Sequence, residues 1–427
     1  MQLTRASRSR ATRVAGSAGL LALAVGRLLG APTAAALDVH GITIDQATLI
    51  YQEQGRIGVV EPVVALRLPL PGEQSLGLRY GFDAMSGASP NGTTPTITAH
   101  TYTSPSGRQY TVAQGELPVR SFRDQRHALG LDWERPLTRA LKLSAGLNGS
   151  FETDYRSLGA SLSFSQDVNQ KLTTLSLGLS LSEDRLVPRG GVPLPLGDYQ
   201  SRVILSDTES KHIRDVLVGV AQVMNRRWLT QLNLGYGRDQ GYLTDPYKGV
   251  SLLDGQGEPV TWVSEGRPGS RTRATLFWGN ALHLGRDVVH ADYRRYQDNW
   301  GVQSNTFTLQ YWWKPEAGLP GLRVRPELRV STQRKADCYA HSMLQSEYEA
   351  QAPSTLTADS RLAGMQSVGA SLRLDLPAAD WGQLWIKPMW MNEHFALFPD
   401  AVGAQHSVDL VPDLQVWMVT IGFRTTL

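Results

Sequence analysis

The stretch Gln415–Leu427, QVWMVTIGFRTTL, decides the fold of this chain. Alternate residues of a β-strand point to opposite sides, so this stretch has two distinct faces. One face is apolar: Trp417, Val419, Ile421, Phe423 and Leu427. The other face is more mixed: Val416, Met418, Thr420, Gly422 and Arg424. A final strand that is apolar along the whole of one face predicts the closing strand of a barrel in lipid.

The middle of the chain repeats this alternation. In Leu141–Phe151, leucines alternate with Lys, Ser, Gly and Asn, and the stretches 158–164 and 175–181 alternate leucine or phenylalanine with serine or glycine. One such stretch would suit a half-buried soluble strand. Three in succession, with small polar residues on one face, predict lipid outside and a lumen inside.

Counting such segments predicts about sixteen strands. We place them near 44–52, 58–68, 75–85, 122–135, 141–153, 156–167, 171–183, 212–224, 228–239, 272–285, 287–297, 303–313, 321–331, 366–376, 381–392 and 413–426. Every second connection is a short turn, and the others include all the long ones, at 86–121, 184–211, 240–271, 332–365 and 393–412. This asymmetry predicts an all-β, antiparallel up-and-down transmembrane barrel with short periplasmic turns and long extracellular loops.

The amino terminus has the pattern of a secretory signal. Arginines at 5, 8, 10 and 13 precede an apolar region at 14–30, and Ala34-Ala35-Ala36 favours cleavage after Ala36. We therefore expect a signal peptide at 1–36 and a single barrel domain at 37–427. An amphipathic or disordered basic arm is the alternative.

Composition excludes several classes of protein. The signal region holds five of the 42 Lys and Arg residues and no acid, which leaves 37 basic residues against 39 acidic ones. Nothing basic then remains to predict nucleic-acid binding. The single cysteine, Cys338, excludes an internal disulfide. No apolar run after the amino terminus is long enough for a helical membrane span.

Several loop motifs carry a family resemblance. They are Ser86–Gly92, Asp154–Gly159, Gly241–Lys248, Arg271-Thr272-Arg273 and Asp298–Gly301. Together they resemble a family of uncharacterised proteobacterial outer-membrane proteins, from about residue 40 to the end. The resemblance implies an outer-membrane barrel in a Gram-negative bacterium and carries over no catalytic residue.

Charged residues fall on the face that the alternation turns inward, because a charge facing lipid at the midplane would cost about 2–4 kcal/mol. The lumen-facing candidates are Arg79, Asp83, Asp132, Lys142, Glu152, Asp292, Arg294, Arg323, Arg325, Glu327, Arg329, Arg373, Asp375 and Lys387. In a water-filled lumen they would form a field that selects solutes by charge. In a closed lumen they would pair and hold the barrel shut.

The loop motif at Gly241–Lys248 supplies a second set of candidates: Tyr242, Asp245, Tyr247 and Lys248, with Arg271 and Arg273 just beyond. The functional interpretation is a solute-contact or constriction loop folded inward. The alternative is a loop that packs on its neighbours, since ordered loops often use Tyr, Pro and Asp for turns.

Two further patterns suggest sites of other kinds. Cys338, His341 and Met343 are soft ligands that could hold copper or zinc, although a closed zinc site needs more ligands. We expect an incidental loop composition, no metal and no cofactor. The aromatic residues around 385–398, and Trp312 and Trp313 at the other end, predict two aromatic girdles at the membrane interfaces.

A passive pore for small hydrophilic solutes, selecting by lumen width and mixed inward charge, is the function that these patterns favour. A loop-plugged structural or binding barrel that docks a periplasmic or surface partner is the alternative. A hydrolase built around His283, His290 and Asp292 is a third hypothesis, although no G-x-S-x-G or H-E-x-x-H motif occurs, so we expect no enzyme. The expected partners are outer-membrane lipid and, through the C-terminal strand, the assembly machinery of that membrane.

Overall fold

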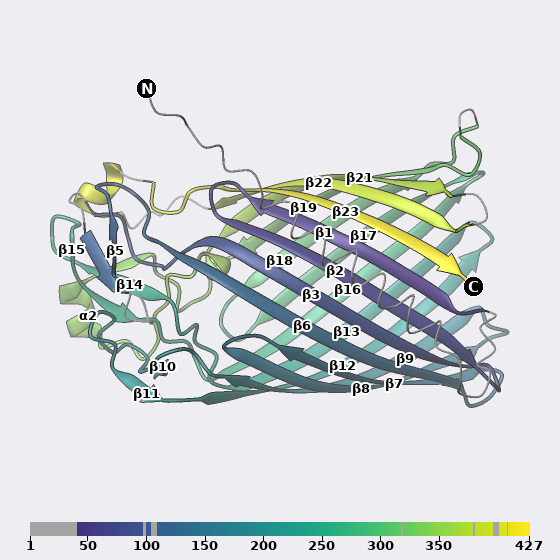
Figure 1. Ribbon diagram of the computed structural model, residues 1–427, viewed down its shortest axis with the longest axis horizontal. Helices are drawn as coiled ribbons and strands as arrows, with labels where there is room; N and C mark the ends of the chain where they lie inside the picture. Colours follow the sequence, from purple (N-terminus) through teal and green to yellow (C-terminus); the bar gives the residue numbers. More distant parts are fainter. Residues whose placement is uncertain are drawn as a thin grey trace, which may run out of the picture.

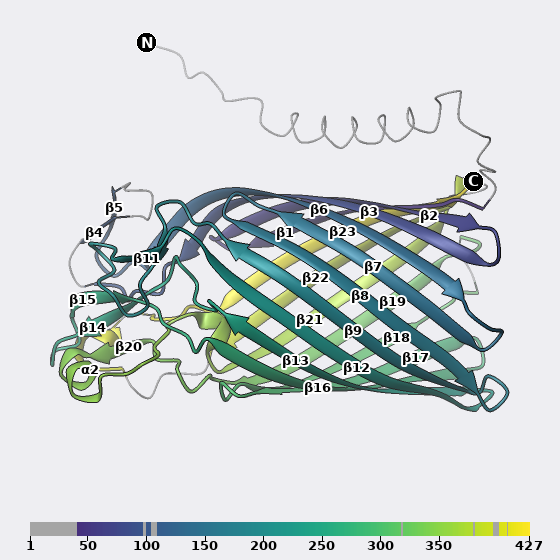
Figure 2. The ribbon, with the colours of Figure 1, turned by 90° about the horizontal axis from the view of Figure 1, so that it is seen from below.

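The structure is a computed structural model that describes residues 41–96, 100–103, 109–316, 319–378, 381–395, 401–407 and 409–427. Sixteen antiparallel strands form a closed barrel, and a folded cap covers one end of it (Figures 1 and 2). The barrel strands are β1 (Thr43–Glu53), β2 (Ile57–Leu70), β3 (Gln74–Pro90), β6 (Val119–Pro136), β7 (Leu141–Phe151), β8 (Tyr155–Val168), β9 (Thr173–Leu186), β12 (Glu209–Asn225), β13 (Trp228–Gly241), β16 (Ser270–Leu284), β17 (Asp287–Asp298), β18 (Gln303–Trp312), β19 (Arg323–Arg334), β21 (Met365–Pro377), β22 (Gln383–Phe395) and β23 (Leu414–Thr426).

The predicted barrel is confirmed. Each of the sixteen predicted segments overlaps one barrel strand, in the predicted order, and the short turns gather at the end of the barrel where the chain terminates. The predicted signal peptide lies outside the described residues. None of the helices in the described part of the chain is long and apolar enough to cross a membrane.

The carboxyl-terminal strand closes the barrel. β23 pairs with β22 on one side and with β1 on the other, from Thr43 opposite Thr426 to Glu53 opposite Val416. Closure leaves no unpaired strand edge, which is a requirement for a sheet surrounded by hydrocarbon.

The two faces of the barrel differ as the alternation predicted. Leu147, Leu158 and Leu181 point outward and are 59, 63 and 58% exposed. Trp417 and Ile421 of the closing strand also point outward, at 61 and 44%. A soluble protein would bury such a belt, so its exposure is that of a barrel whose outer surface contacts lipid.

The long loops fold into a cap that the sequence did not predict. It contains a hairpin of β4 (His100–Thr103) with β5 (Gln109–Val112), a hairpin of β10 (Val192–Pro193) with β11 (Ile204–Ser206), and a sheet of β14 (Gly249–Leu253), β15 (Pro259–Ser264) and β20 (Ser342–Leu344). Helix α2 (Gln345–Gln351) and the 3-10 turns η1 (Ser360–Leu362) and η3 (Gly403–Ser407) complete it. β14 and β20 are parallel neighbours from loops about ninety residues apart, so two loops build one sheet.

Candidate functional site: the lumen and the cap

Strand register places the predicted charged residues on one face. Of the fourteen lumen candidates, thirteen lie on the inner side of barrel strands, and Glu152 follows the end of β7 at the mouth. Ion pairs on this face reach across an intervening strand. Arg67 of β2 contacts Glu134 of β6 at 2.7 Å, and Lys387 of β22 contacts Glu327 of β19 at 3.3 Å.

The inner wall formed by β7, β8 and β9 carries small polar side chains, and no described loop covers it. Asn148, Ser161 and Ser163 point inward and are exposed. Leu217 of the adjoining β12 also points inward and is 43% exposed, with Gly178 as its cross-strand neighbour. An inward leucine has so large an exposed fraction only where neither a loop nor a long side chain covers it.

The opposite wall is cationic. The carboxylate of Asp375 is fully buried and binds two guanidinium groups, Arg325 at 2.9 Å and Arg373 at 2.8 Å. Each guanidinium lies over an indole ring, 4.3 Å from the Trp312 centroid for Arg325 and 4.1 Å from the Trp385 centroid for Arg373. Stacking on tryptophan and pairing with one carboxylate hold the two arginines in fixed positions.

Three further arginines on this wall are exposed to the lumen: Arg294, Arg323 and Arg329. Among the described residues, none of the three forms an ion pair or a hydrogen bond. Their charge is therefore available to solutes.

Acidic residues gather at the mouth below the cap. Arg126 binds Asp83 at 2.5 Å and Glu61 at 3.6 Å. Beside them, carboxylate oxygens of Asp124, Glu152 and Asp154 lie within 4.8 Å of one another. This cluster lines a recess of about 640 Å³, which Lys248 and Arg361 of the cap border from the other side.

The Gly241–Lys248 loop anchors the cap to the rim of the barrel. Gly241 has φ +115°, and a Cβ there would lie 2.2 Å from the Ser210 carbonyl oxygen, so the bend out of β13 requires glycine. Tyr242 is buried and donates to the Pro193 carbonyl at 3.2 Å. Tyr247 donates to Asp154, and Lys248 donates to the Pro90 carbonyl at 2.5 Å. The two tyrosines and the lysine thus each bind a different neighbour of the loop.

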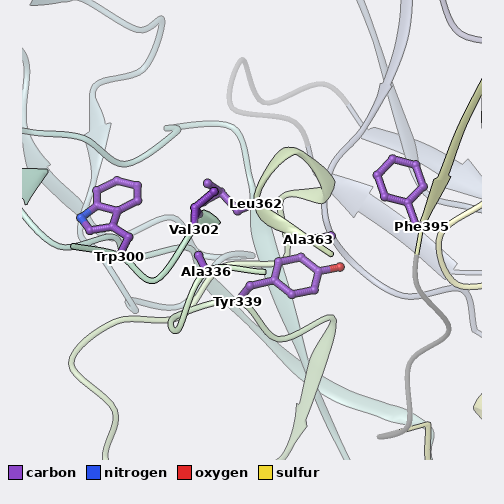
Figure 3. Close-up of a cluster of buried hydrophobic side chains, with 7 residues drawn as sticks. All are labelled: Trp300, Val302, Ala336, Tyr339, Leu362, Ala363 and Phe395. Atoms are coloured by element: carbon purple, nitrogen blue, oxygen red, sulfur yellow. The ribbon is translucent and has the colours of Figure 1, made fainter. Parts of the chain in front are cut away.

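Arg271 and Arg273 lie on the inner face of β16 rather than in the loop. Arg271 binds Asp298 at 2.5 Å and lies 4.5 Å from the ring centroid of Trp300. Arg273 bridges Asp215 and Asp239 at 3.0 and 2.8 Å. Figure 3 shows Trp300 among the buried side chains that join the cap to the end of the barrel beside it.

A buried charge network holds the cap loops to one another. Glu265 is fully buried and accepts hydrogen bonds from the Asp245 amide at 2.6 Å and from Thr357 at 2.5 Å. Arg267 binds Glu265 at 2.8 Å and Asp359 at 2.7 Å. The network joins the loop after β13 to the loop after β19, so their relative position depends on paired charge.

Burial raises the pKa of Glu265 to about 7, against the opposing charge of Arg267. Burial also disfavours ionisation of Asp359, but hydrogen bonds and charge from Arg361 outweigh it and hold that pKa well below its ordinary value.

We expect the cap to lose stability between pH 5 and pH 8. A raised folded-state pKa means that the folded cap retains a proton which the unfolded chain releases near 4.5. This stabilisation is complete below pH 4.5 and is lost as the pH rises through about 7. Hydrogen exchange of cap amides, corrected for intrinsic rates, would measure it, with Glu265→Gln as the control that removes the dependence. Equal pH dependence in parent and variant would refute the assignment to Glu265.

The family of the chain follows from its sequence. Residues 15–425 match a family described as "Protein of unknown function (DUF3570)". The chain belongs to this family. This confirms the resemblance to an uncharacterised family, and no curated protein matches the chain.

Solved structures that resemble this DUF3570 member share little sequence with it. CdiB from Acinetobacter baumannii has a TM-score of 0.45 at 8% identity over 90% of this chain, which spans 60% of the length of CdiB. The outer membrane protein opdK from Pseudomonas aeruginosa has a TM-score of 0.45 at 10% identity, over 91% of this chain and 100% of opdK. OccK2 (OpdF) from the same organism, solved in complex with glucuronate, has a TM-score of 0.40 at 10% identity, over 92% of this chain and 99% of OccK2.

The structure separates the soft-ligand candidates of this DUF3570 member. Cys338 packs against the cluster that contains Trp300, whereas Met343 packs against the cluster that contains Val250. His341 is buried, and its Nε2 lies 3.2 Å from the Leu410 carbonyl oxygen. The two sulfur-bearing side chains therefore belong to different packing clusters.

Two of the predicted girdle tryptophans occupy other positions. Trp312 and Trp385 point inward and carry the stacked arginines, so they do not contact lipid. Trp313, 46% exposed, remains at the short-turn end. Phe395 is also inward and is buried in the cluster that contains Trp300, whereas Phe398 lies outside the described residues. The prediction was wrong for these three inward residues because it relied on residue type and not on the phase of their strands.

Some site residues were missed. Asp124 and Arg126 share the inward phase of Asp132 on β6, so extending that alternation would have found them. Glu265, Arg267 and Asp359 lie in irregular segments with no period to read, and nothing in the local sequence brings them together.

Proposed function

We propose that this DUF3570 protein is a passive outer-membrane pore for small hydrophilic solutes, which selects them by lumen width and by the charge on the inner wall. The observation that carries the proposal is the uncovered polar wall of β7–β9, with inward Ser161 and Ser163 exposed and Leu217 open to the lumen. Barrels of ~16 strands enclose an aqueous channel unless loops fill it.

The charge distribution of the inner wall supports selection. Arg294, Arg323 and Arg329 present cations on β17 and β19, while Asp124, Glu152 and Asp154 present carboxylates at the mouth. A solute would pass the acidic mouth and then the cationic wall, so both its size and its charge pattern would affect passage.

Single-channel recording tests the pore. Purified full-length protein, shown to be folded by heat-modifiable migration on a detergent gel, is added to a planar bilayer in potassium chloride. We expect steady, ohmic conductance steps, because an open polar lumen passes hydrated ions. Folded protein that inserts into the bilayer and produces no steps would exclude the proposal.

A plugged barrel that binds a partner is the second candidate, and the folded cap favours it. The cap has its own buried clusters around Trp300 and Val250 and a fully buried Glu265 network. Such a cap could close the outer end and present a fixed surface to a ligand. If removing the contacts that hold the cap raises conductance from zero, this candidate replaces the open pore.

Export and assembly form part of the same proposal. We propose that a signal at 1–36 is cleaved on export and that β23, the closing strand, is the segment presented to the assembly machinery. The proposal assigns no catalysis. His290 lies 4.3 Å from Trp312 between ring centroids, and Asp292 is its neighbour on β17, at the end of the barrel with the short turns.

A further inference from the structure

The outer surface of the barrel carries four exposed arginines on adjacent strands. Arg156 of β8 lies directly opposite Arg185 of β9, and Arg214 of β12 lies directly opposite Arg238 of β13. β9 and β12 are themselves neighbours, so the two pairs lie on one outer surface, with Arg214 opposite Leu181, four residues from Arg185. All four side chains are exposed, and we call this surface the arginine patch.

The register shows that the patch faces away from the lumen. Asp184 and Lys211 point inward and form an ion pair at 3.2 Å, and Arg185 is the next residue after Asp184. On β13, Asp239 points inward to Arg273, and Arg238 precedes it. Adjacent strand residues point to opposite faces, so these arginines point outward.

Among the described residues, no acid or hydrogen-bond acceptor contacts any of the four arginines. Among the described outward residues of β8, β9, β12 and β13, the one acid is Glu183, which contacts His212. Like charges directly opposite each other in a sheet repel. Each arginine pair therefore suits an external anion, and Glu183 with His212 lies between the two pairs.

The position of the patch along the barrel axis indicates which anion it meets. On β9 the outward residues Leu175, Leu177, Leu179 and Leu181 are all exposed, and the outward run then continues through Glu183 to Arg185. At about 3.3 Å per residue and a tilt of roughly 40°, Arg185 lies about 25 Å above Leu175, the height of an apolar belt. On β13 the outward Leu232, Leu234 and Tyr236 lead in the same way to Arg238. The patch therefore lies where lipid headgroups begin, on the side of the cap.

We propose that the arginine patch binds the phosphate groups of a phosphorylated membrane lipid in the leaflet that faces the cap. A guanidinium binds phosphate through two parallel N–H···O bonds, and a phosphate between paired arginines would remove their repulsion. The leucines below would contact the acyl chains of the same lipid. This inference requires a barrel in lipid and is independent of whether the lumen conducts.

Two pair variants and a matched control test the patch. R156Q/R185Q and R214Q/R238Q each remove two outward arginines. R226Q/R227Q removes the same charge from the turn of the β12–β13 hairpin, at the opposite end of the barrel. Full-length protein in neutral detergent is titrated with bisphosphorylated lipid A, with lipid A stripped of its phosphates, and with inorganic phosphate.

We expect each pair variant to bind bisphosphorylated lipid A about thirty-fold more weakly than the parent, and the control to bind as the parent does. Parent protein that binds the stripped lipid equally well, or pair variants that retain full affinity, would overturn the proposal. Inorganic phosphate that displaces the lipid at equal concentration would overturn the assignment to a lipid.

Thermal stability gives a second readout that a nonspecific folding defect would not produce. In neutral detergent the pair variants should unfold at the same temperature as the parent or a higher one, because repulsion is removed. With bisphosphorylated lipid A present, the parent should be the more stable. Variants that are less stable than the parent in both conditions would contradict the proposal.

Discussion

Reversing the charge of Arg294, Arg323 and Arg329 to glutamate is expected to lower the chloride-to-potassium permeability ratio of the pore at least tenfold. A unit charge about 4 Å from a permeating ion contributes about 1 kcal/mol even in water, and each reversal changes the sign of that contribution. These three arginines are exposed on the inner wall and have no ion-pair partner among the described residues. Reversal potentials across a potassium chloride gradient measure the ratio.

The matched control is Arg334→Glu. Arg334 lies on β19, as Arg323 and Arg329 do, but has the opposite phase and points outward. Its reversal should leave the permeability ratio unchanged. The effect of the triple variant should also shrink at high salt, since the screening length falls from about 10 Å at 0.1 M to about 3 Å at 1 M. An unchanged ratio in the triple variant, or an equal change with Arg334→Glu, would show that the cationic wall does not select ions.

The choice of arginines in this experiment follows from the structure. Arg325 and Arg373 are closer to the tryptophans but share the buried carboxylate of Asp375. Replacing either would remove one of the two cations that pair with this buried carboxylate and destabilise the wall, so selectivity and stability would change together.

The barrel could be predicted from the sequence because lipid imposes a period of two on every strand. Leu175, Leu177, Leu179 and Leu181 face hydrocarbon, and the intervening Ser176, Gly178 and Ser180 face the lumen. Phase alone therefore assigns the inward charges to one face. The same phase would have placed Trp312 inward, next to Gln310 and Thr308 of β18.

The cap could not be predicted in this way. Its sheet pairs Ser251 with Ser342, and its buried acid Glu265 meets Asp359 through Arg267. These contacts join loops of irregular backbone, where no period assigns a side chain to a face. The arginine patch could be predicted in part. Phase turns each arginine outward, but the cross-strand register that pairs them is set by the whole barrel.

Arg267→Ala is expected to destabilise the cap by about 3–5 kcal/mol while leaving the barrel intact, because it leaves the buried carboxylate of Glu265 without its cation and Asp359 with Arg361 alone. Glu265 is fully buried, Asp359 is 1% exposed, and the Arg267 side chain is 12% exposed, so water screens this network little. Proteolysis of cap loops under native conditions should accelerate, while the temperature of the heat-modifiable shift should not change. Cleavage at the parent rate would contradict this account.

A double variant separates charge from packing in the same network. Glu265→Gln with Arg267→Met removes the arginine and neutralises one of its two carboxylates while keeping side-chain volume, so it should recover part of the resistance lost in Arg267→Ala. Arg267→Met alone, which keeps the volume but not the charge balance, is the comparison. Recovery in the double variant only would assign the loss to charge, and equal recovery in both variants would assign it to packing. Conductance of Arg267→Ala then discriminates between the two functions. An open pore should keep its conductance when the cap loosens, whereas a barrel closed by its cap should begin to conduct.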